Sequence, residues 1–317
     1  MAKNKPEIPT DLLNFLDRLP NDLQEKMTPK VRNQFFLWDE ILKRDITLYP
    51  RHILPLIQEI FHRTYPADIK IEAVSTEYSV SRISLQNGKR LSAIHSDLLL
   101  KVGEKDYYHF ECQIEEDETM AIRMLEYDLH AGLAHGAGQP ASANAPFHLS
   151  LPNSAVLYLS HSKRTPDFLA CKLHFQDGSS HLFRVPVLKV QAYTTEMVAE
   201  RGLYLLIPFL PIRVRKYLKR KNGSAIAKNK LTILIQKCMI VLEDGMASGR
   251  LTGNERSDLT EFLFAACSSI FAGEPDFLEE VHDMMEPAIK LRREIYAEQH
   301  AEIMQQQLEI AQQKLEI

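Results

Sequence analysis

The sequence has few cysteines, no glycine-rich phosphate-binding loop and no long apolar run. Its four cysteines are scattered without a CxxC pair, which favours reduced thiols over a disulfide framework or a zinc site. The N-terminus, MAKNKPEIPT, lacks the apolar core of a secretory signal, and no stretch reaches the roughly 18 apolar residues of a membrane span. The longest candidate, 203–212, contains two prolines. These absences predict a cytoplasmic protein without a membrane segment.

An excess of charge of one sign is also lacking, because the net charge is only −4. A weakly acidic chain that binds a polyanion must do so through a local basic patch. There is no supporting motif for Ser/His/Asp or Cys/His nucleophilic catalysis. The 317 residues, 45% hydrophobic and 25% charged, are ordinary for a soluble globular protein and suffice for one main domain with a helical annex.

Apolar periodicity predicts an α/β protein. Helices are expected at 53–64 and from Thr119 to about 133, and the pattern is helical beyond Thr194. Strands are expected at 71–80, 90–102, 107–114, 155–160, 169–175 and 181–188. The chain divides into a helical leader at 1–50, a core at 51–200, a helical region at 201–290 and an amphipathic or coiled-coil tail at 291–317.

Two acidic elements occupy neighbouring strand candidates. Asp97 begins one apolar run, and Glu111 lies inside the next, with Gln113 two residues further on. Because side chains alternate along a strand, Glu111 and Gln113 share a face. The turn composition of residues 102–106 predicts a hairpin that folds the first strand back beside the second. Two carboxylates and an amide oxygen meeting there would suit Mg²⁺ or Mn²⁺.

Later landmarks extend this pattern. They are Arg123 and Tyr127 in the helix after the acids, VPVLKVQAY at 185–193 and LLIPF at 205–209. Together with Ser96-Asp97 and Glu111-Cys112-Gln113, they make residues 50 to 220 resemble the PD-(D/E)XK nuclease superfamily. The closest resemblance within it is to the group called recombination-promoting nucleases or PD-(D/E)XK nuclease family transposases.

The resemblance implies both a fold and an activity. The fold would be a restriction-endonuclease-like mixed sheet flanked by helices, with a helical C-terminal extension. The activity would be that of a deoxyribonuclease dependent on Mg²⁺ (or Mn²⁺), an endonuclease of the transposase type that acts in DNA recombination. Asp97 and Glu111 would hold the metal, and Gln113 would help bind it or position the attacking water.

Gln113 departs from the family motif, which has lysine at this position. A glutamine orients a water by hydrogen bonding but brings no cation. Other members of the resembled group also carry Glu-x-Gln, so an active hydrolase is the first expectation. The alternative is a catalytically degenerate nuclease-fold protein that binds nucleic acid or a partner protein.

Glu59 has two interpretations. It lies in the first predicted helix, from which nucleases of the resembled superfamily often draw an additional metal-binding carboxylate. It is otherwise an exposed helical residue, and Glu72 and Glu77 on the following strand compete for the metal-binding role.

Arg123 also has two interpretations. It shares a helix face with the tyrosine four residues on, and it either contacts a DNA phosphate or bridges to Glu118 or Glu126. His109, two residues before Glu111, is compatible with a place near the site or with a place in solvent.

The segment 213–230 contains eight basic residues and no acidic one. Such a run would neutralise DNA phosphates without reading the base sequence, or it is simply a solvated helix end. The expected DNA contacts are Arg213, Arg215, Lys216, Lys219 and Arg220, together with Arg123.

The C-terminal tail has apolar residues at heptad spacing, namely Met304, Leu308, Ala311 and Leu315. This spacing is typical of a short coiled coil. The tail would either pair two subunits in a homodimer or lie as a single amphipathic helix.

Overall fold

The computed structural model describes residues 33–74, 77–78, 94–95, 98–138, 145–218, 220 and 223–289. Parts of the expected picture lie outside these residues, namely residues 1–32 of the leader, the strand positions 79–80 and 90–93, Asp97, Lys219 and the tail at 291–317. The described residues belong to two compact units, divided between Thr194 and Thr195. Among the described helices, none has both the length and the apolar character that crossing a membrane requires.

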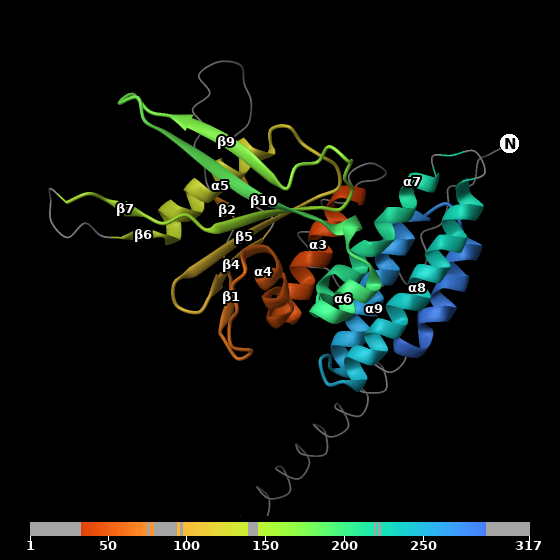
Figure 1. The fold of residues 1–317 in the computed structure, drawn as a ribbon. Coiled ribbons are helices and arrows are strands. Elements are labelled where there is room, and N and C mark those ends of the chain that lie inside the picture. Colours follow the sequence, from red (N-terminus) through yellow and green to blue (C-terminus); the bar gives the residue numbers. More distant parts are fainter. Residues whose placement is uncertain are drawn as a thin grey trace, which may run out of the picture. The chain divides into compact units, whose positions relative to one another are not determined.

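The first unit is built on an open, mixed six-stranded sheet (Figure 1). The strand order is β1 (Ile71–Val74), β4 (Leu98–Val102), β5 (Asp106–Gln113), β8 (Asn153–Tyr158), β10 (Ser180–Lys189) and β9 (Phe168–His174). The β5–β8 and β8–β10 pairs are parallel, and the β1–β4, β4–β5 and β9–β10 pairs are antiparallel. The expected α/β class is therefore confirmed.

The expected hairpin is formed by β4 and β5. Leu98 pairs with Phe110 and Val102 with Asp106, and between the strands Gly103 adopts a φ of 64°. That left-handed conformation costs a glycine little, because no Cβ meets the backbone. The turn residues identified in the sequence thus set the register of the two strands.

The two faces of the sheet are covered by different helices (Figure 1). Phe61 of α4 (Ile53–Phe61) packs against Tyr108 and Phe110 of β5. On the opposite face, Met120 and Met124 of α5 (Met120–His135) pack in a buried cluster with residues of β8 and β10, listed as Val156, Tyr158 and Val185. The polar face of β5 is therefore the one that α5 covers.

Several element boundaries differ from the sequence-based expectation. The first predicted helix ends at Phe61 instead of residue 64, because His62 takes a left-handed conformation with a φ of 55°. Of the predicted strand 71–80, the described residues form β1 and a separate two-residue strand β2 (Glu77–Tyr78), which pairs with β3 (Ile94–His95). A second small pair, β6 (Ala137–Gly138) with β7 (His148–Leu149), was not expected.

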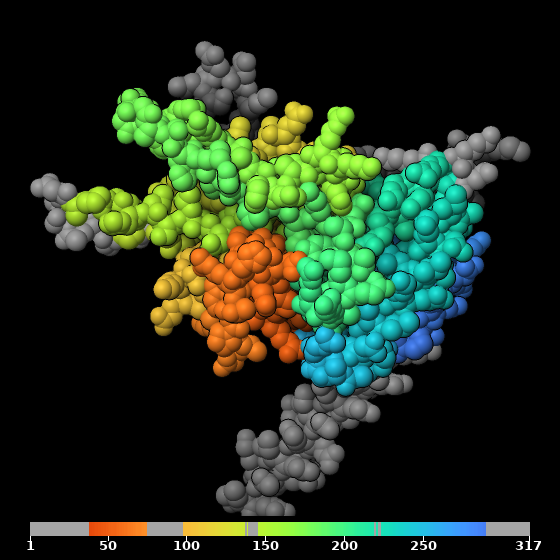
Figure 2. All heavy atoms as spheres, in the orientation of Figure 1, coloured from red at the N-terminus to blue at the C-terminus, as the bar shows by residue number. Residues whose placement is uncertain are grey.

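Short elements and one projecting hairpin complete this unit. A helix α3 (Asn33–Leu48) and a 3₁₀ turn η1 (Pro50–His52) precede α4, so α3, which falls in the expected leader, belongs to the sheet unit. The β9–β10 hairpin turns at the predicted Asp177-Gly178 position, and its tip stands out from the other spheres of this unit (Figure 2). A further 3₁₀ turn, η2 (Val190–Ala192), follows β10.

The second unit is helical, as the sequence predicts beyond Thr194. Its elements are α6 (Thr195–Arg201), η3 (Tyr204–Val214), α7 (Arg215–Leu218), α8 (Gly223–Ala247), α9 (Gly253–Ile270) and a further helix at 275–289. The buried η3 is a 3₁₀ helix that contains Pro208 and Pro211. Each proline removes a backbone N–H donor, which disfavours an α-helix there.

Candidate functional site

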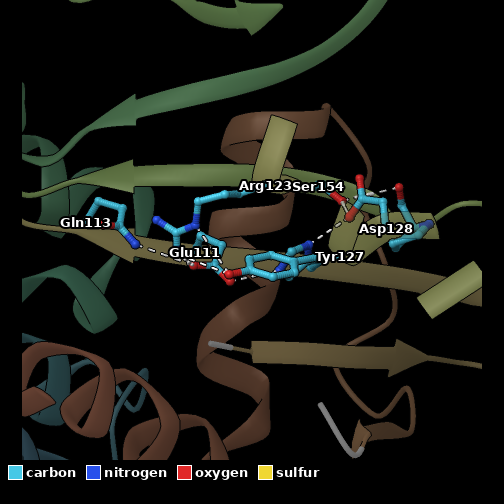
Figure 3. A network of polar contacts seen from close by, with 8 residues as sticks. Glu111, Gln113, Arg123, Tyr127, Asp128 and Ser154 are labelled. Carbon is cyan, nitrogen blue, oxygen red and sulfur yellow. Dashed lines mark hydrogen bonds and ion pairs between the residues drawn. The ribbon is translucent and has the colours of Figure 1, made fainter. Parts of the chain in front are cut away.

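Glu111 and Gln113 lie on one face of β5, as strand alternation predicted (Figure 3). His109 lies on the same face, within hydrogen-bonding distance of Glu111. The Glu111 side chain is only 1% exposed. One carboxylate oxygen, Oε1, is 3.2 Å from His109 Nε2. The other, Oε2, accepts a long hydrogen bond of 3.5 Å from the Gln113 amide nitrogen. A buried carboxylate of this kind requires compensating partners, and the strand itself supplies two.

His109 connects Glu111 to a second buried carboxylate. Its Nδ1 is 2.7 Å from Oδ1 of Asp128 on α5, and the Ser154 hydroxyl on β8 donates to the same oxygen at 2.6 Å. Burial lowers the pKa of His109, but the hydrogen bonds to Asp128 and Glu111 outweigh it and raise this pKa to about 9. Because both ring nitrogens face carboxylate oxygens, the imidazolium form, which donates from both, fits this place.

Arg123 lies at the other end of the network (Figure 3). Its guanidinium donates to the Tyr127 hydroxyl at 3.2 and 3.3 Å and to Asp117 at 3.0 Å, and it is 4.0 Å from Glu111 Oε2. The sequence suggested Glu118 or Glu126 as the acid that Arg123 would bridge to, but the structure pairs Arg123 with Asp117. The Arg123 side chain is 35% exposed, so it remains accessible to a ligand.

Asp117 also organises the start of α5. It accepts hydrogen bonds from the Thr119 hydroxyl and backbone N–H, at 2.7 and 2.8 Å. These two bonds, with the nearby Arg123 guanidinium, lower the pKa of the Asp117 carboxyl. A carboxylate at a helix N-terminus is favoured by the helix dipole as well. The acidic segment before α5 therefore fixes the position of Arg123.

The buried part of the network is balanced in charge. The two buried carboxylates, Glu111 and Asp128, have two cationic neighbours, His109 and Arg123. The third carboxylate, Asp117, is 33% exposed, so solvent screens its charge. Any ligand of this site would therefore meet Glu111 from the accessible side, where Arg123 lies.

Metal ligation by this network alone is incomplete. Within the residues that the structure describes, no group of three or more His, Cys, Asp and Glu side chains has the arrangement of a metal site. Glu111 and Gln113 offer carboxylate and amide oxygens, which are the donor types that Mg²⁺ and Mn²⁺ prefer. The other expected ligand, Asp97, belongs to the part of the chain that is not described.

Glu59 is engaged elsewhere. The Tyr193 hydroxyl donates to its Oε1 at 2.8 Å. Helix α4, which carries Glu59, packs against the face of β5 opposite to Glu111. Its competitor Glu72 forms an ion pair with Lys70 at 2.6 Å. The structure thus joins neither glutamate to the network around Glu111 through the contacts described above.

The basic run lies in the helical unit. Lys216, Arg220 and Lys230 surround the ring of Tyr217, at 5.4, 5.3 and 5.1 Å from its centroid. Arg215 begins α7. Arg213 differs from these residues, because it is half-buried, donates to the Leu210 carbonyl at 3.0 Å and has a pKa lowered by burial. Of the expected DNA contacts in this run, Arg213 is the least suited to reach a phosphate.

Comparisons with protein-family models, curated proteins and solved structures gave no match to this chain. The interpretation of the site therefore depends on its geometry. Sequence reasoning missed Asp128, although a signal for it exists: an acid four residues after Met124 and three before Ala131 falls on the apolar, core-facing stripe of α5.

Proposed function

We propose that this protein is a metal-dependent DNA endonuclease of the PD-(D/E)XK type, related to transposases and recombination-promoting nucleases. The observation that carries the proposal is the buried Glu111 on a central strand, which shares a face with Gln113 and lies 4.0 Å from the guanidinium of Arg123. A carboxylate and an amide on one strand face offer the oxygen donors that Mg²⁺ and Mn²⁺ prefer. The nearby guanidinium suits a phosphate, and the three groups together support a site for phosphodiester hydrolysis.

We propose Asp97 as the second acid. It directly precedes Leu98 in the sequence, and the Cα of Leu98 pairs with that of Phe110, the residue before Glu111. Its carboxylate would give the metal site a second negative charge, which suits a divalent cation.

Each site residue has an expected role in phosphodiester hydrolysis. Asp97 and Glu111 would hold Mg²⁺ or Mn²⁺, and Gln113 would either help to bind the ion through its amide oxygen or position the attacking water. When bound, such an ion polarises a phosphate and lowers the pKa of a coordinated water. If Gln113 positions the water, its amide does so by hydrogen bonding. The accessible guanidinium of Arg123 would contact a phosphate oxygen of the DNA.

One observation favours the alternative, a degenerate nuclease-fold protein that binds DNA without cutting. Glu111 already has an ion-pair partner in His109 at 3.2 Å and a second in Arg123 at 4.0 Å. A carboxylate with two cationic neighbours needs a metal less than an isolated one does. Metal-dependent cleavage distinguishes the two functions.

The direct test is incubation of the purified protein with supercoiled plasmid, with and without Mg²⁺ or Mn²⁺. We expect nicking or linearisation only with metal. Gln113→Ala should lower the rate by about 10²-fold, a loss typical of removing one positioned hydrogen-bonding group, and Gln113→Lys should keep or raise it. Metal-independent cleavage, or none by the wild type, would contradict the proposal.

A separate prediction concerns DNA binding by the basic run. Replacing Arg215, Lys216, Lys219 and Arg220 with Gln should weaken binding to all sequences alike. The slope of log affinity against log salt should flatten by up to about 0.9 for each lost phosphate contact. Fluorescence anisotropy at several salt concentrations measures this slope. Arg213→Gln serves as the comparison, because the half-buried side chain of Arg213 should contribute little to DNA binding. An unchanged slope in the fourfold variant would mean that the run is a solvated surface and does not contact DNA.

A further inference from the structure

We propose that His109 is a positioning residue, which holds the Glu111 carboxylate in the orientation that binds the metal and is itself held by Asp128 and Ser154. The inference rests on the proposed function, and it assigns a role in that function to residues that would not touch the metal. It concerns the specific hydrogen bond between His109 Nε2 and Glu111 Oε1, at 3.2 Å.

Because of this bond, the two carboxylate oxygens of Glu111 have different neighbours. Oε1 is taken up by His109, while Oε2 faces the Gln113 amide and the Arg123 guanidinium, at 3.5 and 4.0 Å. Oε2 is therefore the oxygen left on the side of Gln113, where the metal is expected. Without the bond to His109, the carboxylate could rotate about its terminal torsion, which has only weak preferences.

Contacts from two neighbouring elements, α5 and β8, hold the imidazole of His109 on β5 in place. His109 belongs to β5, Asp128 to α5 and Ser154 to β8, and the last two meet at one oxygen, Asp128 Oδ1. The ring of Tyr127 lies edge-on to the imidazole, with centroids 5.8 Å apart. Replacing a group that hydrogen-bonds a metal-binding side chain in this way typically costs about 10- to 100-fold in metal affinity or activity.

One atom of the network argues against a purely stabilising role. Asp128 is fully buried, yet its Oδ2 has no hydrogen-bond partner among the residues that the structure describes. A buried acceptor without a partner costs stability. An arrangement selected for stability alone would satisfy both oxygens, whereas one selected to orient His109 needs only Oδ1.

A matched pair of variants separates positioning from stabilisation. The side-chain nitrogen of glutamine falls near the place of Nε2 in histidine, and that of asparagine falls near the place of Nδ1. His109→Gln therefore keeps a donor for Glu111 and loses the one for Asp128, and His109→Asn does the reverse. Both variants remove the same charge.

The experiment measures Mn²⁺ affinity by calorimetry, plasmid cleavage and thermal unfolding for the full chain and both variants at one pH. We expect His109→Asn to lose about tenfold or more in both Mn²⁺ affinity and cleavage rate, and His109→Gln to lose clearly less, even where His109→Asn is the more thermally stable of the two. Equal losses in both variants, or a smaller loss in His109→Asn, would overturn the inference.

The wild type separates the inference from the proposed function. A wild-type protein that neither binds Mn²⁺ nor cleaves DNA overturns both, whereas an active wild type with indistinguishable His109 variants overturns the inference alone. If neither variant folds, Asp128→Asn takes their place, since its amide oxygen still accepts from Ser154. A several-fold loss of Mn²⁺ affinity in this variant supports the positioning role, and an unchanged affinity contradicts it.

Discussion

Replacing Glu111 with Gln is expected to abolish metal-dependent DNA cleavage, with a rate loss of about 10³-fold or more. The substitution leaves the shape of the side chain but removes the negative charge that would hold the metal. Asp97→Asn should have the same effect. Plasmid cleavage in Mg²⁺ and in Mn²⁺ measures both losses, and cleavage that survives either substitution would contradict the assignment of the two acids.

The two variants should differ in stability. Repulsion between two close carboxylates would make either substitution neutral or stabilising. Glu111, however, accepts from His109 in a buried place, so Glu111→Gln should cost about 1–3 kcal/mol of unfolding free energy through a weakened buried hydrogen bond. Asp97→Asn should cost little. Urea unfolding of the metal-free proteins provides this comparison.

Replacing His109 with Leu is expected to destabilise the sheet unit by about 3–5 kcal/mol, since it removes the cation that lies between two buried carboxylates, Glu111 and Asp128. Because the pKa of His109 is raised in the folded protein, from 6.5 to about 9, its contribution is complete below pH 6.5 and is lost as the pH rises through about 9. Urea unfolding should show a smaller difference in unfolding free energy between wild type and variant at pH 9.5 than at pH 6.

The control is His174→Leu, at an exposed position on β9. Surface substitutions of this kind usually change the unfolding free energy by less than about 0.5 kcal/mol. A loss for His109→Leu no larger than that of His174→Leu would mean that the imidazolium does not stabilise the buried network.

The features that the sequence predicted correctly depend on residues close together in the chain. Glu111 and Gln113 share a face because strand alternation involves only neighbouring residues, and the β4–β5 hairpin follows from the turn around Gly103. A glycine and charged residues between two apolar runs carry that information within a few positions. These features were correct for that reason.

What the sequence could not predict depended on packing between distant segments. Asp128 reaches His109 only because α5 crosses over the face of β5. Glu59 was a candidate ligand by analogy with the first helix of other nucleases, but α4 lies on the opposite face of the sheet. Neither relation is written in the spacing of the residues along the chain.

The parallel pairing of β5 with β8 affects how the network around Glu111 forms during folding. The charged and polar side chains of the network, from His109 to Ser154, all come from the single segment of chain between Asp106 and Tyr158, which contains β5, α5 and β8. Contacts that close short stretches of chain form at lower entropic cost than contacts between remote segments. The network can therefore form early, and a rearrangement of the gene that interrupts this one stretch would remove the whole network at once.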